Sequence, residues 1–208
     1  MFLRDEELFI VSLFIVHFSM IIPRASWNAL PPDHSVKDEH GLFDPRTNPG
    51  GWRMYTEPLD QVLRTIVIHH SALAPTFGAA DIQRLHIEKR GFADIAYHFV
   101  IAADGKIFEG RSIQVRGAHV EGANTGSVGV VLLGNFEEAA PPEIQVRATR
   151  ELIDHLRSSY PHITHLAGHC DFNQDSVCPG RHLYPLLETL AREASLHYGT
   201  GGYVRPQY

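Results

Sequence analysis

Three separate stretches of this chain carry side chains that bind transition metals. A β-branched run ends in the pair His69 and His70, an Ala-Gly pair precedes His169, and a Pro-Gly pair follows Cys178. Imidazole nitrogen and thiolate sulfur are ligands that zinc prefers, and three protein ligands leave the fourth tetrahedral position open. The pattern therefore predicts a zinc site of the open, catalytic kind, in a fold that brings the three stretches together.

Each of these residues also has a plain structural interpretation. A histidine at the end of a buried strand is commonly hydrogen-bonded and a cysteine is commonly buried, so the prediction depends on the whole constellation. Cys170 and Cys178 are the two cysteines of the chain, and a disulfide between them would remove the thiolate ligand. If Cys170 bound as a fourth ligand, the site would be closed and the zinc structural. We favour Cys178 alone, because its sequence context is the more specific.

The charge and size of the chain exclude some classes of function. A net charge of -6 and a pI near 6.1 leave no basic stripe for neutralising phosphates, which argues against nucleic acid as the main partner. The 208 residues, 44% of them hydrophobic, suffice for one sizeable core. We therefore predict one globular domain, over residues 21–198, that binds a ligand other than a polyanion.

Both ends of the chain are expected to lie outside this domain. Residues 8–22 are apolar but shorter than the roughly 20 residues that a membrane-spanning helix needs, and acidic residues outweigh Arg4 before them. For residues 1–20, a signal, an anchor, a misassigned start codon and an N-terminal element packed on the domain therefore remain open. Residues 199–208 are predicted to form a flexible tail.

Strands alternate with helices in the hydrophobic pattern. Short apolar runs predict strands, and an Asp-Gly pair at 104–105 predicts a hairpin, since glycine accepts positive φ. The fold class is α/β, with a central mixed β-sheet flanked by helices. The predicted strands are 65–70, 96–101, 106–109 and 128–133, the helices are 81–90, 142–159 and 181–198, and 31–58 is a long loop. The inward positions of the last two helices are predicted to be Ile144, Ala148, Leu152 and Leu156, and Leu183, Leu187 and Leu190.

In their order along the chain, these segments resemble the zinc amidases of peptidoglycan, a family that includes peptidoglycan recognition proteins, phage endolysins and bacterial N-acetylmuramoyl-L-alanine amidases. The resemblance covers residues 21–190. It is carried by Ile-Pro-Arg-Ala-Ser-Trp at 22–27, Ile-His-His-Ser at 68–71, Asp-Ile-Ala-Tyr-His-Phe at 94–99, Asp-Gly-Lys-Ile-Phe-Glu-Gly-Arg at 104–111, Gly-Ala-His at 117–119, Ser-Val-Gly-Val at 127–130, Gly-Asn-Phe at 134–136, Gly-His at 168–169 and Cys-Pro-Gly at 178–180.

The resemblance implies a role for each residue of the site. By the family pattern the zinc (Zn2+) ligands are His69, His169 and Cys178, and the catalytic tyrosine, which stabilises an oxyanion or transfers a proton, is Tyr97. Ser176 stands where many relatives carry a Lys or Thr that acts as a second oxyanion donor. The resemblance also implies residues around the substrate groove, namely His70, which packs or orients, with His119 and Arg111. Asp171 is expected to hydrogen-bond near the ligand His169 without touching the metal.

The implied reaction is hydrolysis of the amide between the lactyl group of N-acetylmuramic acid and the L-alanine of the stem peptide. A dication held by two imidazoles and one thiolate keeps a net charge of about +1, which polarises a carbonyl and activates water. The partners implied are peptidoglycan or muropeptides, which favours an extracytoplasmic location; no feature of the sequence indicates a protein partner. The alternative is a non-catalytic module that binds or senses peptidoglycan. Ser112 and Ile113 stand where relatives carry residues that select the stem peptide, so that preference is left open.

Overall fold

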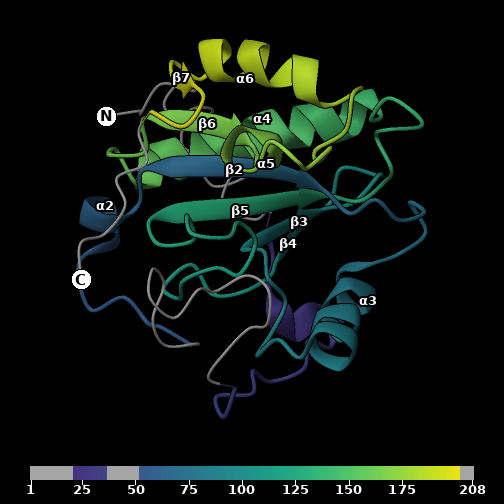
Figure 1. Cartoon of the computed structure of the whole chain (residues 1–208), viewed down its shortest axis with the longest axis vertical. Helices are drawn as coiled ribbons and strands as arrows, with labels where there is room; N and C mark the ends of the chain where they lie inside the picture. Colours follow the sequence, from purple (N-terminus) through teal and green to yellow (C-terminus); the bar gives the residue numbers. More distant parts are fainter. Residues whose placement is uncertain (1–20, 37–51, 202–208) are drawn as a thin grey trace, which may run out of the picture.

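A seven-stranded mixed sheet forms the centre of the computed structural model, which describes residues 21–36 and 52–201 (Figure 1). The strands β2, β5, β6, β3 and β7 run parallel, and β4 runs antiparallel to β3. This confirms the predicted fold class. The strand order across the sheet is β1 (Ile21–Ile22), β4 (Ile107–Glu109), β3 (Phe99–Ile101), β5 (Ser127–Leu132), β2 (Thr65–His70), β6 (His165–Gly168) and β7 (His197–Tyr198).

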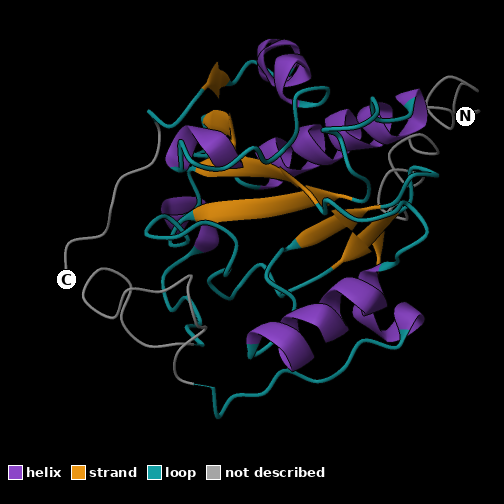
Figure 2. Cartoon of the chain, turned by 45° about the vertical axis from the view of Figure 1, so that its right-hand side comes forward, coloured by secondary structure: helices purple, strands orange, loops and turns teal. Residues whose placement is uncertain are grey.

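Helices cover both faces of this sheet (Figure 2). The apolar sides of α4 (Glu143–Ser159) and α6 (Leu187–Glu193) pack on one face. On the other face lies α3 (Ala79–Arg84), which continues into a π-helical turn, η2 (Leu85–Lys89). The shorter elements are η1 (Arg24–Trp27), α2 (Leu59–Val62), α5 (His169–Phe172) and η3 (Tyr184–Leu186).

The central strand β2 determines which way its two histidines point. Side chains alternate between the faces of a strand, and all six residues of β2 are buried. Ile66 and Ile68 belong to the core under α4 and α6, so His70 shares their face. His69 is in register with Val131, which packs on the opposite face with α3. The pair therefore splits across the sheet, and the site containing His69 lies on the α3 face.

The predicted helix over residues 181–198 is wrong in length. Pro185, which has no N–H to donate, falls in the 3-10 turn η3, and the α-helical part is limited to α6. Ser195 then takes a positive φ of 56°, and the chain continues as β7 because the N–H of His197 donates to the carbonyl of Thr164 at 2.9 Å. The leucines predicted to face inward are buried, namely Leu183, Leu187 and Leu190.

Helix α4 begins one residue later than predicted, and its inward face differs at one position. Ile144 is 43% exposed, and Gln145 takes the inward place instead. The side-chain amide of Gln145 donates to the carbonyls of Ile101 and Leu133 at 2.9 and 3.1 Å, which satisfies main-chain groups where β3 and β5 end. A polar residue was needed there for a reason that hydrophobic periodicity does not reveal. The other three predicted residues are buried, namely Ala148, Leu152 and Leu156.

The remaining predicted elements occur near their expected places. The helix predicted at 81–90 begins earlier, at Ala79, and Gly91 follows it with a φ of +69°. The hairpin of β3 and β4 turns at Gly105, whose φ is +83°, although β3 starts only at Phe99. Residues 1–20, 37–51 of the predicted loop and 202–208 of the predicted tail lie outside the described residues.

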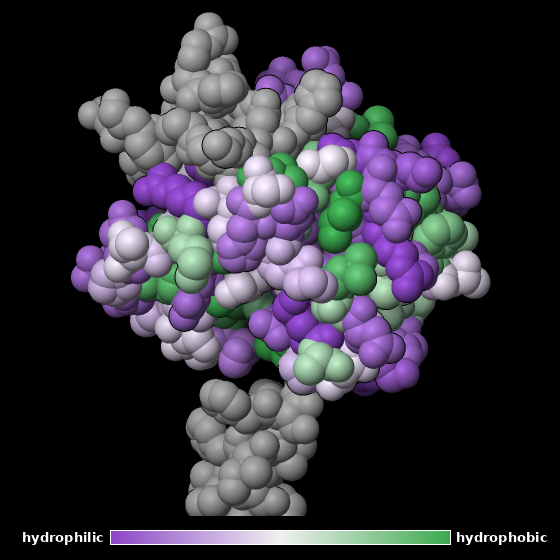
Figure 3. All heavy atoms as spheres, turned by 90° about the horizontal axis from the view of Figure 1, so that it is seen from below, coloured by the Kyte–Doolittle hydropathy of each residue, from purple (hydrophilic) through white to green (hydrophobic). Residues whose placement is uncertain are grey.

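Apolar side chains are dispersed on one face of the domain. On the face in Figure 3, outside the grey atoms, hydrophobic residues form small groups between hydrophilic ones. None of the helices in residues 21–36 and 52–201 combines the length and the apolar character that crossing a membrane requires.

Candidate metal centre

The three predicted metal ligands meet at the carboxyl edge of the parallel strands. His69 lies near the end of β2, His169 is the first residue after the neighbouring strand β6, and Cys178 follows α5 in a loop. One ligand atom from each lies within 4.8 Å of the other two. Among the described residues, this is the one group of three or more His, Cys, Asp or Glu side chains close enough to hold a metal.

The geometry and chemistry of these donors fit zinc. Cys178 Sγ lies 3.6 Å from His69 Nδ1, and ligands of a tetrahedral zinc with ordinary bond lengths are about 3.5 Å apart. Burial raises the pKa of the Cys178 thiol to about 12, so the metal-free thiol stays protonated at neutral pH. A dication would displace that proton, because a coordinating thiol is deprotonated.

His70 orients the centre from the other face of the sheet. Its Nδ1 accepts a hydrogen bond from the N–H of Phe136 at 3.2 Å, and only 6% of the residue is exposed. The main-chain N–H of His70 donates to Cys178 Sγ at 3.4 Å. This bond favours the thiolate form and fixes its direction. The ring of His70 thus packs against the loop after β5 and is not presented to a ligand on the α3 face.

Tyr97 lies beside His69, one of the three candidate metal ligands. The two ring centroids are 5.0 Å apart, and Tyr97 is partly exposed. Burial, and secondarily the nearby Cys178, raises the pKa of the Tyr97 phenol above its ordinary value. The phenol is therefore a hydrogen-bond donor throughout the neutral range.

A buried ionic network fixes the segment that carries Tyr97. The carboxylate of Asp94 lies 3.0 Å from Arg24 Nη1 and accepts hydrogen bonds from the side chain of Gln83 at 2.6 Å and the N–H of Ile95 at 2.7 Å. The carbonyl of Tyr97 accepts the N–H of Arg111 at 2.8 Å. The irregular chain between α3 and β3 is thus held by charge-assisted hydrogen bonds.

Two other predicted residues act on the main chain around the ligands. Ser176 is half-buried, and its Oγ accepts the N–H of Cys178 at 3.2 Å, which leaves its hydroxyl hydrogen available. The carboxylate of Asp171 accepts the N–H of Gly168 at 2.7 Å and the hydroxyl of Tyr184 at 2.5 Å. Asp171 thereby holds the start of α5, and with it His169, through the backbone rather than through the imidazole.

The predicted substrate contacts of Arg111 and His119 do not fit their positions. Arg111 is fully buried, and its guanidinium donates to the carbonyls of Ile95, Arg116 and Asp94 at 2.8, 3.1 and 3.3 Å. An irregular segment has carbonyls that no strand satisfies, and the five donors of an arginine serve them. His119 is only 3% exposed and lies behind the centre, where its Nδ1 is 3.0 Å from His69 Nε2.

Two further histidines under the centre were not indicated by the sequence patterns. His98 accepts the N–H of Gly129 at Nδ1, at 2.9 Å, and contacts the carbonyl of Val115 through Nε2, also at 2.9 Å. His86 Nδ1 accepts the N–H of Ala96 at 3.0 Å. Burial lowers the pKa of His98 to about 4 and that of His86 to about 3. Both are neutral at physiological pH and belong to the interior.

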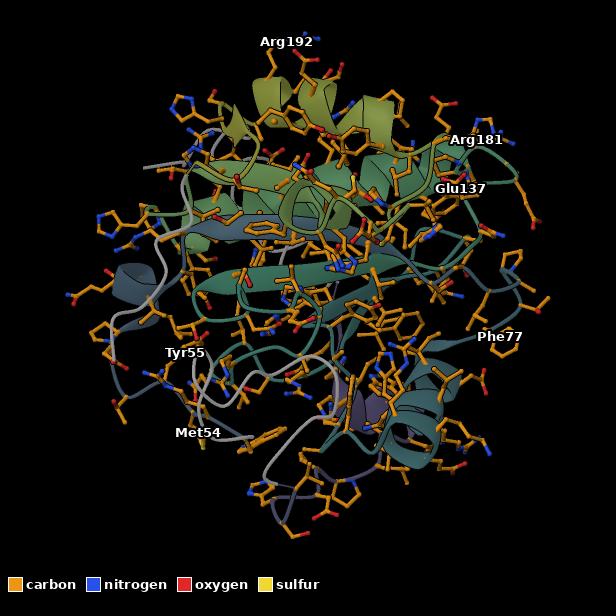
Figure 4. The ribbon with its side chains drawn as sticks, in the orientation of Figure 1. Met54, Tyr55, Phe77, Glu137, Arg181 and Arg192 are labelled. Carbon is orange, nitrogen blue, oxygen red and sulfur yellow. The ribbon has the colours of Figure 1, made fainter. Side chains whose placement is uncertain are left out.

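A pocket of about 530 Å³ lies against the loops that follow β2 and β5. Its wall includes Phe136, whose main chain bonds to His70. Figure 4 shows Glu137 and Arg181 close together at this edge. Arg181 donates its N–H to Glu137 Oε1 and its Nε to the carbonyl of Glu137, both at 2.7 Å. These bonds join the loop after β5 to the segment that follows Cys178.

A His-His-Cys cluster at the carboxyl edge of a mixed sheet, with a phenol beside it, is the arrangement that the resemblance to the amidases implies. The sequence profile of one such family, N-acetylmuramoyl-L-alanine amidase, matches residues 59–181. The chain belongs to this amidase family, which confirms the resemblance found in the sequence.

Similar proteins include both recognition proteins and amidases. A peptidoglycan-recognition protein of Drosophila simulans is 34% identical over 181 residues, which cover 83% of this chain and 87% of that protein. A mutant of Drosophila PGRP-LB in complex with tracheal cytotoxin, a monomeric diaminopimelic acid-type peptidoglycan, is 28% identical with a TM-score of 0.65, covering 81% of this chain and 93% of that one. The N-acetylmuramoyl-L-alanine amidase LysC of Clostridium intestinale is 29% identical with a TM-score of 0.60, covering 70% and 94%.

Proposed function

We propose that this protein is a zinc-dependent N-acetylmuramoyl-L-alanine amidase, which hydrolyses the amide between the lactyl group of N-acetylmuramic acid and the L-alanine of the stem peptide. The observation that carries the proposal is the juxtaposition of the ligand set with Tyr97. All three ligand atoms lie within 4.8 Å of one another, and the phenol ring is 5.0 Å from the ring of His69. A protein that only bound peptidoglycan would have no need of an open metal site.

The residues of this chain divide the chemistry among them. Bound zinc would polarise the amide carbonyl and activate water. Tyr97 stays protonated and donates a hydrogen bond to the carbonyl oxygen as negative charge develops there. Ser176 has a hydroxyl hydrogen free for the same purpose, although a neutral group of short reach stabilises an anion less than a lysine would. The hydrogen bond from the main chain of His70 to Cys178 Sγ stabilises the thiolate ligand.

The substrate and location follow from the same proposal. A solved relative holds tracheal cytotoxin, and we infer that this chain binds muropeptides or peptidoglycan of similar chemistry. Such a substrate lies outside the cytoplasm, so we expect the enzyme to work in an extracytoplasmic compartment.

The second candidate is a recognition module without catalysis. It is favoured by the names of relatives such as the peptidoglycan-recognition protein of Drosophila simulans and by the neutral side chain at Ser176, where many amidases carry a lysine. Retention of Cys178 favours the amidase, since binding a wall fragment requires no thiolate.

Mass spectrometry of a defined disaccharide-peptide muropeptide distinguishes the two functions. The amidase releases free disaccharide and free peptide, loses this activity with a chelator and regains it when zinc is added. The Cys178→Ala variant is the matched control and should release neither product. Intact muropeptide in every reaction, despite measured zinc occupancy and binding of the muropeptide, would overturn the amidase and establish the recognition module.

A further inference from the structure

The ring of His119 completes a hydrogen-bonded chain that starts at the metal ligand His69. His69 presents Nδ1 toward Cys178 Sγ, at 3.6 Å, and Nε2 toward His119 Nδ1, at 3.0 Å. The far nitrogen of His119, Nε2, lies 3.5 Å from the Oγ of Ser127. The hydroxyl of Ser127 donates in turn to the carbonyl of Ala123 at 2.7 Å.

The hydrogen bonds in this series can all point in one direction only. Because the hydroxyl hydrogen of Ser127 is used toward a carbonyl, its oxygen faces His119 with lone pairs, and His119 Nε2 carries the hydrogen. A neutral imidazole with hydrogen on Nε2 has an acceptor at Nδ1. The two ring nitrogens of His119 contact an imidazole and a hydroxyl, neither of which carries a negative charge that would stabilise an imidazolium, so the ring is taken as neutral. The hydrogen between the two rings therefore belongs to His69 Nε2, which leaves His69 Nδ1 free to bind a metal.

The surroundings of His119 are shaped to hold its ring in this position. A Cβ on Gly129 or on Gly117 would collide with the same ring atom, His119 Cδ2. The ring thus occupies a slot that two glycines leave open. The main chain is fixed as well, since the N–H groups of His119 and Val120 both donate to Asn124 Oδ1, at 2.7 and 2.9 Å.

We propose that His119 is a positioning residue that locks His69 in the tautomer whose Nδ1 binds zinc. This inference rests on the proposed zinc centre and deepens it. Histidine ligands of metals are commonly oriented by an acceptor behind them, and that acceptor is often a carboxylate. Here the acceptor is a neutral imidazole. The centre therefore gains the orientation without a second negative charge, and the metal with one thiolate keeps its net charge of about +1.

The first test measures zinc affinity, not activity. Competition with a chromophoric chelator gives the zinc dissociation constant of the wild type, His119→Ala and His119→Asn. His119→Ala should bind zinc about 10- to 100-fold more weakly, the usual effect of losing such a partner. His119→Asn should recover most of the affinity, because its side-chain oxygen can accept a hydrogen bond from His69 Nε2. His86→Asn, which also removes a buried imidazole, is the control and should leave zinc affinity unchanged.

The second test needs no substitution and so does not depend on the folding of any variant. Nitrogen-15 NMR of the histidines in the zinc-loaded wild type should find hydrogen on Nε2 of both His69 and His119, and none on Nδ1 of either. Hydrogen on His119 Nδ1 would overturn the proposal. Equal zinc affinity of His119→Ala and the wild type would overturn it too while leaving the zinc centre intact. A wild type that binds no zinc would instead refute the proposed function itself.

Discussion

A main-chain hydrogen bond joins the two cysteines of the chain, since the N–H of Cys170 donates to the carbonyl of Cys178 at 2.8 Å. Only the side chain of Cys178 joins the group of metal-binding atoms found in the described residues. Both cysteines are free thiols in the structure. The candidate centre thus offers three protein side chains, and in the proposed zinc site the fourth position would be left to water or substrate.

Replacing the two cysteines in turn tests whether Cys178 binds the metal and Cys170 does not. Cys178→Ser removes a direct ligand and should weaken zinc binding by more than the 10- to 100-fold that loss of an outer partner causes. Cys170→Ser should keep zinc affinity within about threefold of the wild type. Zinc content after dialysis, measured by mass spectrometry, checks both. X-ray absorption showing two sulfur neighbours would refute the three-ligand centre.

The phenol of Tyr97 should matter for rate and not for metal binding. Tyr97→Phe removes a donor to the developing oxyanion and should lower kcat about 10²- to 10³-fold. Its zinc content should equal that of the wild type, because the hydroxyl is not a ligand. Steady-state kinetics on a muropeptide checks the expectation, with Tyr160→Phe, remote from the centre, as the matched control. An unchanged kcat would remove Tyr97 from the mechanism.

Much of this fold could be predicted from the sequence, because the patterns that indicate its strands and helices are local. The strand over 65–70 and most of the helix predicted over 142–159 follow from apolar runs and periodicity, and the candidate ligands follow from the motifs around His69, His169 and Cys178. The last helix was overestimated because Pro185 and a positive φ at Ser195 act against a pattern of leucines that otherwise continues.

The positions of the buried polar groups could not be obtained in this way. The residue types of Arg111 and His119, and the motifs around them, suit a binding groove. Both residues are buried instead, because Arg111 bonds to main-chain carbonyls and His119 faces a ring nitrogen of His69, and these partners come from distant segments. One local signal did exist. Gly129 interrupts a β-branched strand, and a glycine in a strand interior often marks the close approach of another group. That group is the ring of His119.

A side chain at position 129 should disturb both the fold and the candidate metal centre. In Gly129→Ala the new methyl would collide with His119 Cδ2, so the ring must move away from His69. We expect a loss of about 1–3 kcal/mol in the free energy of unfolding, typical of overpacking, along with weaker zinc binding. Urea denaturation and chelator competition measure the two effects. Gly78→Ala is the control for zinc binding, since its Cβ would meet Asp81 at an ordinary 3.7 Å and should leave zinc affinity unchanged.

Acid should destabilise the protein through histidines that stay neutral when folded. Burial lowers the pKa of His86 to about 3, whereas an unfolded histidine titrates near 6.5. Below pH 6.5 the unfolded state therefore binds a proton that the folded state does not, and the free energy of unfolding decreases as the pH is lowered. Between pH 7 and 5 this one group should remove about 2 kcal/mol from the free energy of unfolding.

Urea denaturation of the wild type and of His86→Asn at both pH values, with a chelator present, isolates that contribution. The variant should lose about 2 kcal/mol less than the wild type over this range, whatever its stability at pH 7. Equal losses in the two proteins would mean that His86 is protonated in the folded state.

The three ligands differ in how firmly the rest of the molecule holds them. His69 belongs to a strand bonded to neighbours on both sides, whereas Cys178 belongs to a loop held by turn bonds, by the pair of Arg181 and Glu137, and by single bonds from the main chains of Cys170 and His70. Local opening reaches such loops long before it reaches a central strand. If the centre binds zinc as proposed, we expect metal release to begin at the sulfur, while both imidazoles are still in place. The centre would then lose and regain its ion through a two-histidine state, without unfolding of the domain.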